Sequence, residues 1–171
     1  MQIKKTCFIL FFISAFFFQA QSQNGDIPSV DIKTVYGERF NTDDIDNEGN
    51  PIILSFWATW CKPCLKELNA INEVYYDWQD ETGVKVIAVS IDNSRSTSKV
   101  LPLVNGNSWD YEVYLDANGD FKRAMGVNMI PHTFLLNGDK EVVWQHTSYS
   151  EGSEYEMYEK IKKVAAGEPI E

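Results

Sequence analysis

The sequence predicts an α/β domain in which a mixed β-sheet is flanked by helices, and three consecutive segments carry this prediction. Residues 51–58 form an apolar run that starts at a proline and contains β-branched and aromatic side chains, which is typical of a buried strand. In residues 62–82, apolar side chains recur every three or four positions, as in an amphipathic helix, and Gly83 then ends the pattern. Residues 84–91 are again almost entirely apolar, as expected for a central strand covered on both faces. Such a strand-helix-strand unit has a right-handed crossover.

The segments on either side of this unit extend the sheet. Residues 30–35 alternate between apolar and polar side chains and residues 36–40 can turn back, which predicts an N-terminal β-hairpin. After the central unit we expect an irregular stretch with a weak helix at residues 95–106, a short strand at 111–115 and a helical turn at 121–125.

A strand, a second strand and a helix are expected to close the domain. Residues 127–136 and 141–146 form two strand-like runs joined through an Asn-Gly dipeptide, which predicts a hairpin with an Asn-Gly turn. Ser153 and Glu156 have the spacing of a capping box, so we expect the last helix to begin there.

Two cysteines lie at the corner where the first buried strand becomes the long helix. Cys61 and Cys64 are two residues apart, so they can close and reopen a disulfide with little backbone movement. Unpaired N–H groups and the helix dipole favour a thiolate at this position, and Lys62 adds a positive charge. Pro63 suits the first helical turn, where its missing N–H costs nothing. Because cysteines in such sites have pKa values below the free value of about 8.5, we expect Cys61 to be an exposed nucleophile and Cys64 a shielded resolving thiol.

Non-catalytic interpretations of the cysteine pair have less support. A structural zinc site needs about four ligands, and His132 and His146 are too far apart to complete a finger pattern. A disulfide across two residues constrains the unfolded chain little, because the stabilisation grows with loop length. A calcium site elsewhere in the chain also has little support, because the acidic stretch from Asp116 lacks the glycine and the glutamate that a calcium loop requires. The sequence therefore favours redox chemistry, with a Cys61–Cys64 disulfide as the working group and no metal or other cofactor.

The first 22 residues have the pattern of a signal peptide. A positively charged start is followed by an apolar core at residues 7–18 that is too short to span a bilayer, and residues 20–22 match a cleavage site. We expect the domain to comprise residues 23–171 and to be periplasmic or secreted after cleavage; an uncleaved signal tethered to the inner membrane is the alternative. Thiols in such a compartment oxidise unless a reductant reaches them.

The charge of the chain limits its partners. The formal net charge is −10, which argues against binding to nucleic acids or to anionic membranes. No long acidic block stands out, so we interpret the acidity as a means of keeping an exported protein soluble. We expect a monomer.

Three segments together match the pattern of a known family. Residues 56–64 read Phe-Trp-Ala-Thr-Trp-Cys-Lys-Pro-Cys, residues 130–134 read Ile-Pro-His-Thr-Phe, and the predicted ββα unit follows. These segments resemble the thioredoxin fold, and residues 61–67 resemble the CxPCxxE signature of the TlpA/ResA-like family of exported thiol-disulfide oxidoreductases. The resemblance covers about residues 28–166. It implies that the long stretch at 92–126 is an insertion before the cis-proline.

The resemblance also assigns residues to a substrate-binding surface. By position, Pro131 matches the cis-proline that faces the disulfide, and Ile130 would offer backbone groups to an extended peptide. The sequence alone indicates that a proline in a strand-like run lies at an edge, at a bulge or at a cis bond. We expect Trp57 and Trp60 to form an apolar contact surface for clients, beside Lys62 and Pro63. The alternative is that the two tryptophans only pack in the core, and this alternative has more support for Trp57 than for Trp60.

Two positions near the cysteines bear on proton transfer. Ser55 stands where cytoplasmic thioredoxins have a buried aspartate, and a hydroxyl cannot act as a base at neutral pH. Glu67 follows Cys64 by three residues on the same helical face, and its side chain leans back toward the helix start. The resemblance implies that this glutamate modulates the cysteine pair; an ordinary solvated glutamate is the alternative. We interpret His132 as a partly exposed neighbour of the site.

Together, these observations predict an enzyme. Cys61 attacks a disulfide of a client protein and Cys64 resolves the mixed disulfide, so that the client leaves reduced. The resemblance implies clients such as apocytochromes, in cytochrome c maturation, or stress-oxidised proteins, and a membrane thiol electron donor. A disulfide oxidase or isomerase and a redox-inert peptide-binding module are the alternatives. A thiol peroxidase has less support, because Ala58 stands where a Thr/Ser-x-x-Cys motif around Cys61 needs a hydroxyl.

Overall fold

The computed structural model describes residues 26–170, in which seven strands form one mixed sheet in the order β2-β1-β5-β4-β3-β6-β7. The predicted signal peptide of residues 1–22 lies outside the described residues. The strands are β1 (Asp31–Thr34), β2 (Arg39–Asn41), β3 (Ile52–Trp57), β4 (Lys85–Ser90), β5 (Glu112–Leu115), β6 (His132–Leu136) and β7 (Val142–Thr147). The helices are α1 (Lys62–Thr82), α2 (Val100–Gly106), α3 (Asp120–Ala124) and α4 (Ser153–Ala165), with short 3-10 turns at Thr42–Asp44 and Thr97–Lys99.

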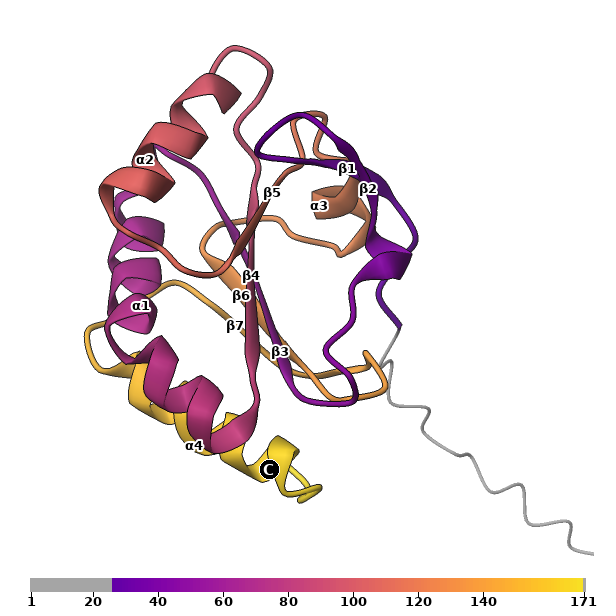
Figure 1. The fold of residues 1–171 in the computed structure, drawn as a ribbon, viewed down its shortest axis with the longest axis vertical. Helices are drawn as coiled ribbons and strands as arrows, with labels where there is room; N and C mark the ends of the chain where they lie inside the picture. The colour runs from indigo at the N-terminus through magenta and orange to yellow at the C-terminus, as the bar shows by residue number, and fades with distance from the viewer. Residues whose placement is uncertain (1–25, 171) are drawn as a thin grey trace, which may run out of the picture.

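The strand pairing confirms the predicted mixed sheet. β3 and β4 run parallel, as do β4 and β5, whereas β6 is antiparallel to β3 and to β7. The predicted N-terminal hairpin is present as β1 and β2, and β1 joins the sheet by pairing antiparallel to β5. In Figure 1, α1, α2 and α4 lie on one side of the sheet and α3 lies on the other. No helix among residues 26–170 combines the length and apolar character that crossing a membrane requires.

The central strand β3 is buried throughout because its side chains enter the core on both faces of the sheet. Ile53 and Trp57 pack on the side of α1 and α4, while Leu54 and Phe56 pack on the opposite side. The neighbouring strand β4 is buried at five of its six positions. This burial on both faces explains the continuous apolar runs in the sequence.

Helix α1 begins and ends at the residues that the sequence indicated. Cys61 is its N-cap, a proline occupies the first turn, and Gly83 caps the C-terminus in the left-handed conformation with φ 68°. The buried positions of α1 include Leu68, Ile71 and Trp78, so the predicted apolar stripe is the face that packs on the sheet. The helix thus holds its N-terminus, with the cysteines, at the end of β3.

Three local predictions were wrong. Residues 127–131 are not part of a strand, and β6 begins only at His132. The hairpin between β6 and β7 does not use a two-residue Asn-Gly turn, because the left-handed residue is Lys140, with φ 66°. Gly138 is needed instead because a Cβ there would lie 2.1 Å from the carbonyl oxygen of Gly49.

The predicted capping box at the start of α4 is also absent. Gly152 is the N-cap, and no side chain caps the helix. The hydroxyl of Ser153 donates a hydrogen bond to the carbonyl oxygen of Ser150 instead, so it stabilises the preceding turn. Glu154 takes part in this turn by accepting hydrogen bonds from Tyr149 and from the N–H of Gly152.

Candidate functional site

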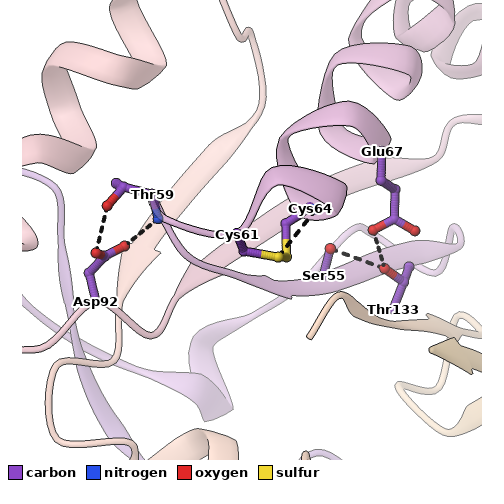
Figure 2. Close-up of a disulfide and its surroundings, with 7 residues drawn as sticks. All are labelled: Ser55, Thr59, Cys61, Cys64, Glu67, Asp92 and Thr133. Carbon is purple, nitrogen blue, oxygen red and sulfur yellow. Dashed lines mark hydrogen bonds between the residues drawn. A yellow bond between two sulfur atoms is a disulfide. The ribbon is translucent and has the colours of Figure 1, made fainter. Parts of the chain in front are cut away.

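Cys61 and Cys64 form a disulfide at the N-terminus of α1 (Figure 2). The Sγ atom of Cys61, the N-cap residue, accepts a hydrogen bond of 3.3 Å from the N–H of Cys64. Cys61 is 5% exposed and Cys64 is fully buried. The N–H of Cys64 belongs to the first turn of the helix, and it would also stabilise the thiolate of Cys61 after reduction. The expectation of an exposed Cys61 was therefore wrong in degree: both residues are buried, and Cys61 keeps only a small exposed fraction that Cys64 lacks.

Exposed apolar side chains lie beside the disulfide. Trp60 is 65% exposed, and Lys62 and Pro63 are also exposed. Trp57, in contrast, is fully buried and packs edge-to-face against Trp109, so its role is in the core. The sequence-based alternative of core packing therefore holds for Trp57 and not for Trp60.

The Ile130–Pro131 peptide bond is cis, as the sequence resemblance implied. His132 pairs with Phe56 across β6 and β3, so the two residues before it lie at the end of the sheet where β3 leads into Cys61. Ile130 is half-buried and Pro131 is buried. This end of the sheet therefore brings together the cis-proline segment and the cysteine loop.

Glu67 lies fully buried under the cysteine pair and is not a solvated surface residue. Its Oε2 atom accepts a hydrogen bond of 3.2 Å from Thr133 Oγ1, which lies 3.0 Å from Ser55 Oγ. Because a carboxylate can only accept, the hydroxyl of Thr133 donates to Glu67 and that of Ser55 donates to Thr133. Figure 2 shows these three side chains pointing toward one another from α1, β3 and β6, next to the disulfide.

The second oxygen of Glu67 contacts a residue that the sequence did not single out for the site. His146 Nε2 lies 2.6 Å from Glu67 Oε1. The register of the β6–β7 pair brings His146 opposite Thr133, so both side chains lie on the face covered by α1. Sequence analysis had considered His146 only as a zinc ligand. Trp144 and His146 are two residues apart and share one face of β7, and this alternation was the signal that could have indicated its position.

Asp92 holds the loop that carries Trp60 and Cys61. It is fully buried, and its carboxylate accepts hydrogen bonds from the N–H and hydroxyl of Thr59, both 2.7 Å, and from the Ser90 hydroxyl at 2.9 Å. Figure 2 shows Asp92 and Thr59 on the opposite side of the disulfide from Glu67. Sequence analysis assigned Asp92 no role at the cysteines, and no local pattern indicated this contact across 33 residues.

His132 is buried, and the prediction of a partly exposed neighbour was wrong. Its Nε2 atom lies 2.9 Å from Gln145 Oε1, and its ring stacks on Phe134. Burial lowers the pKa of His132, because the charged ring loses hydration; the bond to Gln145 offsets part of this effect.

This shifted pKa predicts a loss of stability in acid. The unfolded chain takes up a proton at His132 near the free histidine pKa of about 6.5, whereas the folded state resists protonation. The free energy of unfolding should therefore fall as the pH drops below that value. Urea unfolding at pH 7 and pH 5 should show a smaller loss for His132→Gln than for the unmodified protein. Equal losses in the two proteins would contradict the assignment.

Comparison with known proteins places this site in context. Residues 24–145 match the AhpC/TSA family. The chain is 32% identical over 126 residues to sporulation thiol-disulfide oxidoreductase A of Bacillus subtilis, which covers 72% of this chain and 74% of that protein. It is 30% identical over 139 residues to thiol-disulfide oxidoreductase ResA of Bacillus anthracis, covering 81% and 76% of the two chains. A thioredoxin-like protein from Porphyromonas gingivalis superposes with a TM-score of 0.74 at 52% identity, covering 82% and 92%.

Proposed function

We propose that this protein reduces disulfides in client proteins outside the cytoplasm. The chain belongs to the AhpC/TSA family and is a thiol-disulfide oxidoreductase with the thioredoxin fold. The observation that carries this proposal is the asymmetry of the disulfide. Cys61, at the helix N-terminus, keeps a small exposed fraction, and Cys64 is fully buried. An attacking sulfur and a resolving sulfur need this difference in access.

The reaction proceeds in two exchanges. The thiolate of Cys61 attacks a client disulfide, forming a Cys61–client bond and breaking the client's S–S bond, and the client's second sulfur leaves as a thiolate. The thiol of Cys64 then loses its proton and attacks Cys61, which forms the Cys61–Cys64 disulfide and releases the client's other sulfur. Two electrons pass from the enzyme to the client, and no cofactor besides the cysteine pair takes part.

Glu67 is suited to accept the proton of Cys64. It lies one helical turn after Cys64, it is excluded from water, and Ser55 cannot serve as the base. Trp60, Lys62 and Pro63, with the backbone of Ile130 and the adjoining Pro131, would contact an extended client segment around its disulfide.

The setting of the reaction follows from the signal-like N-terminus. An exported or membrane-tethered enzyme meets oxidised proteins and has to be reduced again by a membrane thiol donor. Apocytochromes during cytochrome c maturation and stress-oxidised proteins are suitable clients, because their cysteines must be reduced in that compartment. The protein would act as a monomer. Its acidity argues against a nucleic-acid partner.

Cys64→Ser should trap the first intermediate. Without the resolving thiol, the Cys61–client bond persists, so we expect a covalent adduct with a disulfide-closed peptide, stable for at least about 100 times longer than with the unmodified enzyme. Non-reducing gels and mass spectrometry measure the adduct, and a Cys61→Ser/Cys64→Ser variant is the control. If folded Cys64→Ser protein forms no adduct that a reductant reverses, the proposed reaction is wrong.

A further inference from the structure

The contact between Glu67 and His146 joins a buried carboxylate to a group at the surface. Glu67 is fully buried, whereas the side chain of His146 keeps 17% of its surface exposed. The 2.6 Å separation of Nε2 and Oε1 is short for a nitrogen-oxygen hydrogen bond, as expected when one or both partners carry a charge. His146 therefore connects the interior of the site to solvent.

The groups around this pair come from every element packed against it. Facing Glu67 are Cys64 on α1, Ser55 on β3 and Thr133 on β6. Burial raises the pKa values of Tyr111 and Tyr149 nearby, to about 12 for Tyr149, where the hydrogen bond to Glu154 has the next largest effect; the charge of Glu67 adds to both shifts. Both tyrosines are therefore neutral hydroxyls at physiological pH.

His146 has neighbours of its own. The ring of Trp144 packs against it, and Lys160 Nζ on α4 lies 5.7 Å from the centre of that ring. His132 on β6 is also close enough for the two histidines to interact electrostatically. Among the contacts described for His146, the carboxylate of Glu67 is the one at hydrogen-bond distance.

A buried carboxylate without a partner tends to keep its proton, because burial disfavours the charged form. A carboxyl group that already holds a proton cannot accept another from Cys64. A donor with a positive charge at hydrogen-bond distance reverses this preference. The partner of Glu67 therefore determines whether Glu67 can act as a base.

We propose that His146 is a positioning residue that keeps Glu67 ionised, so that Glu67 can accept the proton of Cys64 during the resolving step. This inference rests on the proposed function. The proton leaves the Cys64 thiol and passes to the Glu67 carboxylate, while the sulfur of Cys64 forms its bond to Cys61 and the client's sulfur leaves Cys61 as a thiolate. His146 itself contacts neither the client nor the sulfur atoms.

The test separates the two exchanges. Reduced enzyme is mixed with a synthetic peptide closed by one disulfide, the reaction is quenched in acid at set times, and the mixed disulfide is quantified between pH 5 and pH 9. For His146→Phe we expect formation of the mixed disulfide at an unchanged rate. Its resolution at pH 7 should be about ten times slower, and the pH of half-maximal resolution should rise by about one unit. His146→Gln, which can donate a hydrogen bond but carries no charge, should lie between the two.

Two further variants separate this role from a structural one. In a Glu67→Gln background, His146→Phe should cause no additional change, because the carboxylate on which His146 acts is gone. Lys66→Gln removes a positive charge next to Glu67 in the sequence, but Lys66 is exposed and pairs with Glu151, so the pH profile should not move.

An unchanged pH of half-maximal resolution in folded His146→Phe or His146→Gln protein would overturn the proposal. The same upward shift with and without Glu67 would overturn it as well, since His146 would then act elsewhere. Failure of the proposed function has a different signature, because Cys64→Ser would then trap no peptide whichever residue occupies position 146.

Discussion

Cys61→Ser is expected to lower the rate of peptide disulfide reduction by about a thousandfold or more, which in practice abolishes the activity. A serine hydroxyl is not ionised at neutral pH, so the stabilisation that the first turn of α1 offers to a thiolate has no anion on which to act. The remaining sulfur, Cys64, is fully buried and cannot meet a client disulfide. Even if it did, a single thiol could not release the client by forming an internal disulfide.

A continuous assay of peptide reduction with excess dithiol measures this loss. Cys64→Ser is the matched control, because it removes the other sulfur and should retain the first exchange. The folded state of both variants can be compared by circular dichroism, since neither substitution changes the volume of the side chain much. Reduction by Cys61→Ser at the rate of the unmodified enzyme would show that another group attacks the client.

The sequence predicted the parts of the fold that depend on long periodic patterns. The apolar runs of β3 and β4 and the stripe of α1 were recognisable because burial on two faces or on one face leaves a period in the sequence. The failures concern single hydrogen bonds. Ser153 and Glu156 had the spacing of a capping box, yet Gly152 takes the cap position and Ser153 bonds backward to Ser150. Such choices depend on how the preceding turn packs.

The residues of the site also differ in whether the sequence around them carries a recognisable pattern. Cys61, Cys64 and Pro131 carry local signals, namely a spacing and an unusual residue in a strand, and they lie together as expected. The strands expected at residues 127–136 and 141–146 left open which residues pair across the hairpin. In the structure, a turn that ends at Lys140 and an irregular register at Leu135 and Leu136 pair Thr133 with His146. Sequence analysis missed the partner of Glu67 because it could not fix this register.

Asp92 was missed because its contacts are with the chain at Thr59, 33 residues earlier. Its carboxylate accepts three hydrogen bonds, and the N–H of Thr59 has no other acceptor among the contacts described. Asp92→Ala would leave this N–H and the hydroxyls of Thr59 and Ser90 without their acceptor in a largely buried setting. An unsatisfied buried polar group costs roughly 1–3 kcal/mol, so we expect a loss of about 2–4 kcal/mol in the free energy of unfolding.

Asp92→Ala should therefore lower the melting temperature by about 5–15 °C, as measured by calorimetry of the oxidised protein. It should also slow the reaction of Cys61 with a peptide disulfide, because Thr59 precedes Trp60 and Cys61 and its anchor fixes the start of the cysteine loop.

Two smaller substitutions show how much each hydrogen bond of Asp92 contributes to this loss. Asp92→Asn keeps the shape and one acceptor oxygen, and Thr59→Val removes the hydroxyl but keeps the N–H, so each should cost less than the alanine variant. Because both alter one network, their effects on the melting temperature should not add when combined. A melting temperature of Asp92→Ala within about 1 °C of the unmodified protein, or full additivity of the smaller pair, would show that the loop is held by packing rather than by this carboxylate.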